Sequence, residues 1–194
     1  MGAQELQYLS AAEYLEIERA SSEKHEYFCG EIFAMSGASL PHNVISKNTN
    51  GHLFIKLLGK KCQPFGSDLR IHIPSNSLYT YPDISIVCGD PETTDDKFDT
   101  IINPSVLFEI LSPSTQKYDR IEKFELYRDI VSLQEYIMIN SEKIQVLKYF
   151  RNPDNSWLLT EYKSIDDRFE IQTVAVVLSL SDIYEGVQFK EAVV

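Results

Sequence analysis

Cysteine is scarce in this sequence, and long apolar runs are absent. The three cysteines, Cys29, Cys62 and Cys88, are odd in number and widely spaced, which argues against a disulfide framework and a C-x-x-C metal site. We therefore expect buried or half-buried thiols in a reducing compartment. No stretch reaches the roughly 18 apolar residues that a membrane-spanning helix needs. Residues 1–14 lack the basic and apolar segments of a signal peptide. Together these absences predict a cytoplasmic protein.

Positive charge is also scarce, with 18 Lys and Arg against 29 Asp and Glu and a formal net charge of −11. Such a chain repels polyanions, which weighs against a nucleic-acid partner. Residues 41–72 differ from the rest, because they hold a local net charge of +4 with Asp68 as the single acid. The cations of this segment are Lys47, Lys56, Lys60, Lys61 and Arg70. We expect them to form a basic strip that binds DNA weakly, in a way that depends on salt and divalent metal.

The remaining composition is that of a globular protein. Hydrophobic residues make up 43% and charged residues 24% of the chain, which excludes collagen-like, coiled-coil and disordered classes. A length of 194 residues fits one domain. We predict a single domain over 1–194, with an N-terminal helix and hairpin at 10–37, a core at 42–140 and a C-terminal hairpin extension at 143–185.

The N-terminal third reads as a helix, a hairpin and a second helix. Ser10 and Glu13 have the spacing of a capping box, so a helix should follow and fade near residues 20–22. Apolar runs on either side of Cys29-Gly30 predict a hairpin over residues 24–35. Apolar residues at helical spacing then predict a helix over residues 42–60.

The middle of the chain alternates strands and a helix. Period-two patterns predict strands at 69–73 and 81–87, and the nearly continuous apolar run at 105–111 predicts a strand buried on both faces. A helix should follow over 116–130, and another strand over 135–139. A strand, a helix and a strand in this order indicate a parallel, right-handed crossover.

Within the predicted helix at 116–130, four side chains are expected to form the inward stripe. They are Ile121, Phe124, Arg128 and Val131. Further along, we expect a hairpin of residues 144–150 and 157–162, a last strand near 173–178 and a closing turn at 181–184. The fold class is therefore mixed α/β (α+β), with β-hairpins added to a mixed central sheet.

Two acids lie inside predicted strands, where a carboxylate is unusual. Asp83 begins a strand of Ile and Val, and Glu109 lies inside the most apolar strand. A buried carboxylate is costly, so it is protonated, paired or bound to a metal. Strand periodicity places Asp83 on the face of Val87, and Glu109 on the face of Leu111. If the two strands are neighbours, the carboxylates converge, and Mg²⁺ needs little beyond two carboxylates and water.

These residues also carry a resemblance to a known family. Pro82-Asp83, followed after a loop by Glu109-Ile110-Leu111, resembles the PD-(D/E)XK nuclease motif. The strings Y-P-D-I-S-I-V from Tyr81, E-I-L-S-P-S-T from Glu109 and the D-R-x-x-K pattern from Asp119 are similar to the Uma-type family of restriction endonucleases, long catalogued as a domain of unknown function. The resemblance covers roughly residues 10–185. It implies a restriction-endonuclease-like core of helix, three strands, helix and strand.

The resemblance implies metal-dependent hydrolysis of DNA phosphodiester bonds. Asp83 and Glu109 would ligate Mg²⁺ or Mn²⁺, with the Ile110 carbonyl as a further ligand. The PD-(D/E)XK pattern places a lysine where this chain has Leu111. In this family the lysine has moved to the following helix, which implies Lys123 as the residue that assists the attacking water.

Two further residues enter this site as expectations. On a helical wheel Lys123 flanks the apolar stripe, so its side chain would have to bend inward. Lys117 lies nearer the centre of the stripe and is the alternative catalytic lysine. His42, at the start of a helix, is expected to approach the same site.

Each site residue also has a structural interpretation. Asp83 would be a strand-start acid that binds nearby amides, and Glu109 would be half of a buried ion pair. The partners considered for Glu109 are Lys117, Arg120 and Arg70. Lys123 would be an ordinary solvated lysine. The histidines lack the spacing of a zinc site.

Two classes of function are consistent with these features. The first is a metal-dependent endonuclease with DNA as its partner, favoured because both acids of the motif are present. The second is a catalytically weak or inactive binding or regulatory module of the same fold, in a homodimer. Hydrolysis of another phosphodiester is a third possibility. A plasmid-nicking assay on Asp83→Ala and Glu109→Ala discriminates between them.

Overall fold

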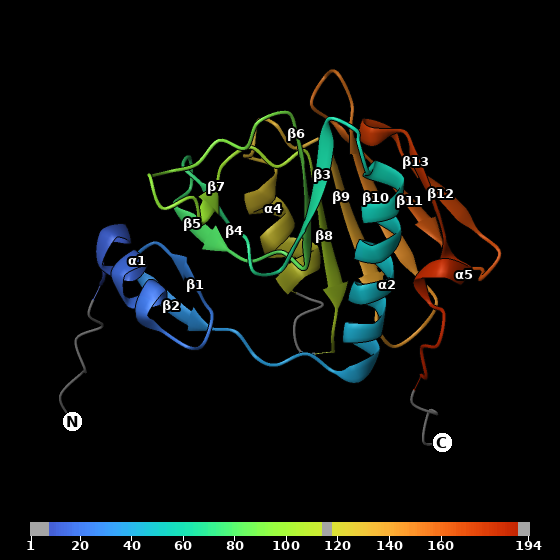
Figure 1. The fold of residues 1–194 in the computed structure, drawn as a ribbon, viewed down its shortest axis with the longest axis horizontal. Helices are drawn as coiled ribbons and strands as arrows, with labels where there is room; N and C mark the ends of the chain where they lie inside the picture. Colours follow the sequence, from blue (N-terminus) through green and yellow to red (C-terminus); the bar gives the residue numbers. More distant parts are fainter. Residues whose placement is uncertain (1–7, 114–117, 190–194) are drawn as a thin grey trace.

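A computed structural model describes residues 8–113 and 118–189 (Figure 1). Its central feature is a sheet of the strands β3 (Cys62–Gly66), β6 (Ile84–Cys88), β8 (Val106–Leu111), β9 (Glu135–Asn140), β10 (Val146–Arg151) and β11 (Trp157–Tyr162). Their spatial order is β11-β10-β9-β8-β6-β3. β8 and β9 are parallel and the other neighbours are antiparallel. The parallel pair confirms the parallel pairing predicted for these strands, and the sheet is mixed, as expected.

A second sheet packs beside the first. Its strands are β1 (His25–Phe28), β2 (Glu31–Ala34), β4 (Arg70–Ile73), β5 (Leu78–Thr80) and β7 (Thr100–Ile101), in the order β2-β1-β5-β4-β7. A further antiparallel pair is formed by β12 (Arg168–Ile171) and β13 (Val176–Ser179). In Figure 1 the first helix with β1 and β2 lies at the left, and β10 to β13 lie at the right.

The helical segments cover these sheets. They are α1 (Ala11–Ala20), α2 (Leu40–Leu57), the π-helical η1 (Asp119–Lys123), its continuation α4 (Phe124–Tyr127), the 3₁₀ turn η2 (Gln172–Val174) and α5 (Leu180–Ile183). Both halves of the Ser10–Glu13 capping box are present at the start of α1. In the described ranges, no helix is long and apolar enough to cross a membrane.

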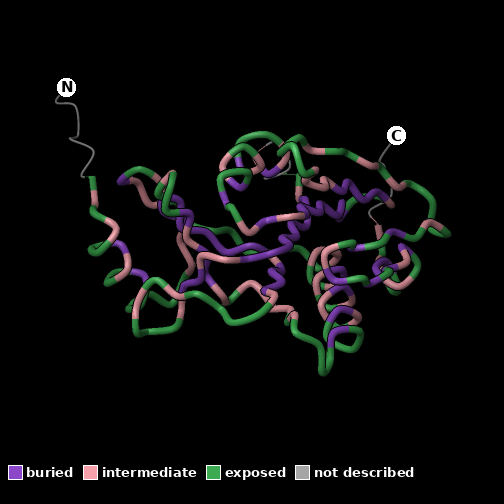
Figure 2. Tube along the Cα trace, turned by 90° about the horizontal axis from the view of Figure 1, so that it is seen from above, coloured by how far each residue is buried: buried purple, intermediate pink, exposed green. Residues whose placement is uncertain are grey.

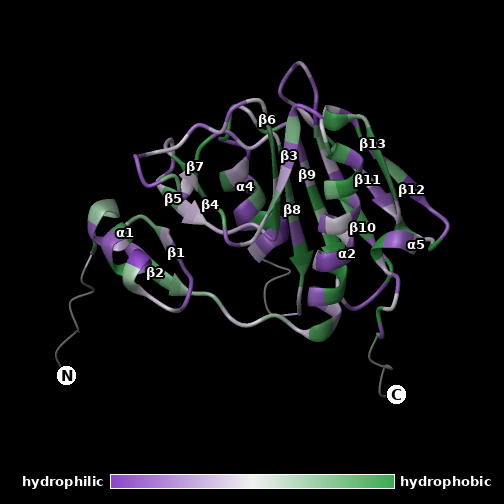
Figure 3. Cartoon of the chain, viewed as in Figure 1, coloured by the Kyte–Doolittle hydropathy of each residue, from purple (hydrophilic) through white to green (hydrophobic). Residues whose placement is uncertain are grey.

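Strand β8 divides the core into two layers because its side chains alternate between faces. Phe108 and Ile110 belong to the apolar cluster that includes α2 and α5. Leu107 and Leu111 belong to the cluster on the other face, which includes Tyr127 of α4 and side chains of the second sheet. All six residues of β8 are buried, as the apolar run predicted. The buried residues gather towards the middle of the molecule in Figure 2, and β8 is largely hydrophobic in Figure 3.

The hairpin of β1 and β2 turns at the predicted place. Cys29 and Gly30 both have positive φ, 48° and 94°, a conformation that favours glycine. A Cβ at Gly30 would also lie 2.5 Å from Tyr8 Cδ1. Glycine at this turn therefore satisfies both the backbone conformation and the close approach of Tyr8.

The strand predicted at 69–73 is present, but it does not belong to the central sheet as the predicted core of three consecutive strands implied. It is β4, which lies in the second sheet, and the first core strand is β3, residues 62–66. Pro64 and Gly66 disfavour a strand there by propensity. β3 is the end strand of its sheet, where the missing N–H of Pro64 is tolerated. β5, β7 and β12 were also not predicted; β5 and β7 are only three and two residues long.

The inward stripe predicted for the helix at 116–130 is also wrong except at Phe124, which packs against the second apolar cluster. Ile121 is 52% exposed and Val131 is 88% exposed. The buried residues are instead Asp119, Lys123, Tyr127 and Ile130. These four residues recur at intervals of four, four and three, the spacing of one regular helix face, so the apolar pattern selected the wrong face of the helix. Residues 114–117, where this helix was expected to begin, lie outside the described residues.

The cysteines also differ from expectation. Cys62 and Cys88 are directly opposite each other in the register of β3 and β6 and form a disulfide. Cys29 is free and exposed. The error arose because the 26-residue separation of the bonded pair gave no indication of a strand pairing, and β3 itself was not predicted.

The attachment of α1 makes stability sensitive to acid. Arg19 of α1 binds Asp95 and Asp99 of the acidic loop at 2.6 and 2.7 Å. Hydrogen bonding to Arg19 holds the pKa of Asp99 well below its ordinary value. A carboxylate with a depressed pKa stabilises the fold above its unfolded-state pKa and loses that contribution as pH falls. In thermal unfolding between pH 7 and pH 2, Asp99→Asn should flatten the acid decline, whereas Asp96→Asn should follow the unmodified protein.

Candidate active site

A cavity of about 770 Å³ opens beside the carboxyl end of β8. It is lined by side chains from both sheets, from the first turns of α2 and from η1. Those that matter for the chemistry are Glu26, His42, Asp83, Glu109, Ile110, Asp119 and Lys123. The cavity therefore brings together segments that lie almost 100 residues apart in the chain.

Asp83 and Glu109 converge in this cavity, although Asp83 comes immediately before β6 and only Glu109 lies within a strand. β6 and β8 are antiparallel neighbours with Ile84 opposite Phe108, so the next step of the register places Asp83 opposite Glu109. Asp83 Oδ2 accepts the Ile110 N–H at 2.7 Å, which fixes its carboxylate against β8. Glu109 is 4% exposed, whereas the Asp83 side chain is 16% exposed. The predicted convergence of the two carboxylates on one cavity is present.

Lys123 lies in the same cluster. Its side chain is buried, and Nζ lies 3.0 Å from Glu109 Oε1 and 2.9 Å from Glu26 Oε1. Asp119 Oδ1 is 3.8 Å away, one turn earlier in η1. Burial acts to lower the pKa of Lys123, but the Glu109, Tyr127 and Glu26 groups outweigh it and raise that pKa well above its ordinary value. The ammonium is therefore charged, and the interpretation of Lys123 as a solvated lysine is wrong.

Glu109 is held by two donors. Besides Lys123, the fully buried Tyr127 donates its hydroxyl proton to Glu109 Oε1 at 2.7 Å. Burial raises the pKa of Glu109 to about 8, although Lys123 acts in the opposite direction. The nearby positive charge therefore does not fully offset the negative charge of the ionised Glu109 carboxylate. Such an environment favours binding of a cation.

His42 reaches the site as expected from its place near the start of α2. Its Nε2 lies 3.1 Å from Asp83 Oδ1. Ser39 caps the helix by accepting the His42 N–H, so the residues that follow the cap face the cavity in a fixed orientation. Both oxygens of Asp83 consequently have a protein partner, Ile110 N–H on one side and His42 on the other.

The donor set fits one divalent cation. Among the residues that the structure describes, no group of three His, Cys, Asp or Glu side chains is arranged to hold an ion. An ion would therefore rest on Asp83, Glu109, a backbone carbonyl and water, which is the sparse protein ligation typical of Mg²⁺. The three carboxylates that share Lys123, those of Glu26, Glu109 and Asp119, carry more negative charge than the one ammonium offsets.

The structure also contains the contacts that the structural interpretation of Asp83 and Glu109 requires. Asp83 binds an amide, that of Ile110, and Glu109 is in a buried ion pair. The partner of Glu109 is Lys123, however, and not Arg120 or Arg70. Arg120 binds Gln145, and Arg70 binds the side chains of Tyr81, Thr100 and Asp99. Lys117, the third partner considered and the alternative catalytic lysine, lies outside the described residues.

Three members of the cluster were not predicted from sequence. Glu26 lies on β1, and Tyr127 and Asp119 lie four residues on either side of Lys123. Asp119 and Tyr127 could have been identified from the sequence, because each lies four residues from Lys123 and residues at that spacing share a helix face. Glu26 gave no such signal, because its approach to Lys123 depends on how the second sheet packs against η1.

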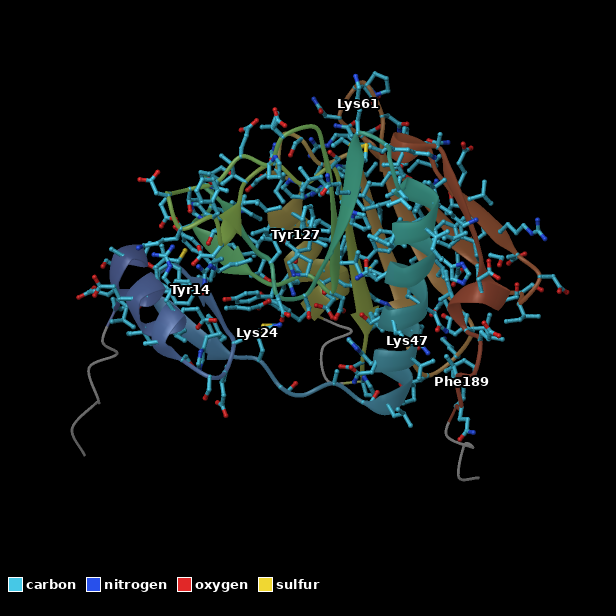
Figure 4. All side chains as sticks on the ribbon, viewed as in Figure 1. Tyr14, Lys24, Lys47, Lys61, Tyr127 and Phe189 are labelled. Carbon is cyan, nitrogen blue, oxygen red and sulfur yellow. A yellow bond between two sulfur atoms is a disulfide. The ribbon has the colours of Figure 1, made fainter. Side chains whose placement is uncertain are left out.

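The basic strip predicted for residues 41–72 does not form one surface. Lys47 and Lys56 are nine residues apart on α2, half a helical turn out of phase. Figure 4 shows Lys47 and Lys61 towards opposite ends of the α2–β3 unit. Arg70 is 3% exposed and bound within the protein. The +4 charge of this segment is therefore distributed over the molecule.

Removing the Tyr127 hydroxyl should weaken the site without disrupting the fold. A hydrogen bond to a charged group contributes about 1.5–3 kcal/mol, so Tyr127→Phe should lower a reaction that depends on ionised Glu109 by about tenfold or more. Tyr149→Phe is the matched control, because Tyr149 packs on Phe124 and lies outside the cavity. Equal rates for the two variants in single-turnover nicking would contradict a role for the Tyr127–Glu109 contact.

The chain is also similar to known proteins. The sequence profile of the Uma2 family, described as "Putative restriction endonuclease", matches residues 11–181. Two uncharacterised proteins of Synechocystis sp. (strain ATCC 27184 / PCC 6803 / Kazusa) are 38% identical to the chain. One, slr1290, aligns over 181 residues, 93% of this chain and 94% of its own. The other, sll1609, aligns over 153 residues, 79% of this chain and 86% of its own.

A solved structure shares the fold. It is the crystal structure of a protein from Anabaena variabilis ATCC 29413 described as a "putative nuclease belonging to DUF820", with a TM-score of 0.75. The match covers 91% of this chain and 97% of that one, at 18% identity, so it concerns the fold alone. It confirms the predicted mixed α/β fold class. The family match spans most of the chain and supports a nuclease-like function, and the chain belongs to the Uma2 family.

Proposed function

We propose that this protein is a metal-dependent DNA endonuclease. Asp83 and Glu109 would hold Mg²⁺ or Mn²⁺, with the Ile110 carbonyl as a further ligand, and Lys123 would assist the attacking water. The observation that carries the proposal is the convergence of Asp83, Glu109 and the buried ammonium of Lys123 on one cavity. The Uma2 family match supports the same reaction class.

The metal, when bound, would lower the pKa of a bound water and offset charge that develops on the phosphate. The protein groups have separate tasks. Lys123 supplies a fixed positive charge near the reacting phosphate, and fixed charges of this kind stabilise developing negative charge without reorganising. Tyr127 and the Ile110 N–H hold the carboxylates of Glu109 and Asp83 in place.

The surroundings of the cavity are compatible with a phosphate backbone. The first turns of α2 line it through His42, Asn43 and Ser46, and the first turn of this helix contains no acid. The partial positive charge of a helix N-terminus favours anions. Lys24 also lines the cavity, with its side chain 37% exposed and its ammonium 2.6 Å from Asp68 Oδ1. Because the positive charge is local, DNA binding should be weak, sensitive to salt and dependent on divalent metal.

The direct test is plasmid nicking in Mg²⁺ and Mn²⁺. The unmodified protein should convert supercoiled DNA to nicked circles, and Asp83→Ala and Glu109→Ala should not. Activity that survives both substitutions would contradict the proposed site. The absence of cleavage in every metal would favour the alternative, a nuclease-fold binding or regulatory module. Homodimerisation, expected because a monomer cleaves one strand at a time, stays a prediction that sedimentation can test.

A further inference from the structure

Glu26 reaches the cavity from a different sheet than the other acids. It lies on β1, is 9% exposed, and its Oε1 lies 2.9 Å from Lys123 Nζ. The fully buried Thr80 of the neighbouring strand β5 donates its hydroxyl proton to the same oxygen. The second sheet thus holds a fixed carboxylate against the ammonium of Lys123.

The two carboxylates nearest to Lys123 share its charge almost equally, at 2.9 and 3.0 Å. If Glu109 were the main partner, the ammonium would compete with a divalent ion, because both are cations that bind the same carboxylate. Glu26 offers Lys123 a second partner. Lys123 can then stay in the cavity, still paired, when Glu109 binds an ion.

We infer that Glu26 is a positioning residue that holds the Lys123 ammonium beside Glu109 while Glu109 binds the metal. The inference rests on the proposed function and adds the second sheet to the active site. Strands β1 and β5 of the second sheet would then fix the position of the Lys123 ammonium, because the central sheet does not fix it alone. Glu26 acts through Lys123 and is not itself a metal ligand.

The first test compares two glutamates of the same cavity. Glu23 also lines it but is exposed, so Glu23→Gln controls for loss of a nearby negative charge. In Mg²⁺-dependent nicking, Glu26→Gln should lower kcat about tenfold or more, because small misplacements of a catalytic group have large effects, with KM for DNA changed less than about twofold. Glu23→Gln should leave kcat within about twofold. An unchanged kcat in Glu26→Gln would overturn the inference.

A double-mutant cycle separates positioning from metal ligation. If Glu26 acts through Lys123, Glu26→Gln should change the residual nicking of Lys123→Met by less than about threefold. An equal loss in both backgrounds would overturn the inference and indicate that Glu26 acts independently. Thr80→Val removes the hydroxyl that holds Glu26 and should produce a smaller loss of the same kind. If Glu26→Gln does not fold, Thr80→Val replaces it as the test variant.

A third measurement does not depend on cleavage. In ¹⁵N NMR spectra, the buried Lys123 ammonium should give a slowly exchanging signal, assigned by its absence from Lys123→Met. That signal should persist in Glu23→Gln and be shifted or lost in Glu26→Gln. An unchanged signal in Glu26→Gln would overturn the inference. If the unmodified protein does not nick DNA, the proposed function fails, and this spectrum still decides whether Glu26 positions Lys123.

Discussion

Replacing Glu109 by glutamine should remove metal-dependent cleavage, with a loss of about 10³-fold or more, while leaving the protein at least as stable. The loss follows because the substitution removes one of two carboxylates available to the ion. Stability should be retained because burial raises the pKa of Glu109 to about 8, so an ionised carboxylate is unfavourable there. Lys123 keeps Glu26 as a partner. Nicking rates in Mg²⁺ test the first half of this prediction, and thermal midpoints measured without metal or DNA test the second.

Glu135 provides the matched control for Glu109. It is a fully buried acid on the adjacent strand β9, paired with Lys148 at 3.3 Å and bound by Thr173, and it lies outside the cavity. Breaking a buried pair costs about 3–5 kcal/mol, so Glu135→Gln should lose stability and keep its cleavage rate at temperatures where it is folded. If Glu109→Gln behaved like Glu135→Gln, Glu109 would be a structural ion-pair residue.

Lys123→Met should lower cleavage by about 10²–10³-fold and leave metal binding intact or tighter. Lys123 supplies positive charge for the reaction, so cleavage falls. The same ammonium lies 3.0 Å from Glu109, so its removal frees that carboxylate for a cation. Mn²⁺ titration of the DNA-free protein, measured beside single-turnover nicking, separates the two effects.

A second buried lysine serves as the control here. Lys148 is 5% exposed and paired with Glu135, and it lies outside the cavity. Lys148→Met should lower the thermal midpoint while cleavage by the folded protein is unchanged. Full cleavage by Lys123→Met would contradict the role assigned to Lys123. Lys117 would then be the candidate catalytic lysine.

The two acids of the site were predictable because strand geometry has a strict period. Alternation placed Asp83 and Glu109 on the faces of Val87 and Leu111, and those two apolar residues do share one cluster. The inward position of Lys123 was expected only from the family resemblance. A helical wheel centred on the apolar side chains placed it at the side of the stripe, whereas the buried face of the helix is the one that carries Asp119, Lys123 and Tyr127.

Other parts of the site depended on long-range packing that no local pattern records. Glu26 meets Lys123 because two sheets pack together, and nothing near residue 26 signals that contact. The Cys62–Cys88 disulfide depended on β3, in which Pro64 and Gly66 obscure the strand pattern. The predicted DNA-binding strip was wrong because sequence clustering of lysines does not fix which face of α2 each one occupies.

The central claim is that Asp83 and Glu109 share one ion, and anomalous scattering from Mn²⁺-soaked crystals tests it most directly. The account predicts one strong peak in the cavity, with a carboxylate oxygen of each residue about 2 Å from it, and no such peak in Glu109→Gln crystals. A cavity without a peak at saturating Mn²⁺, or a peak bound by other residues, would contradict it.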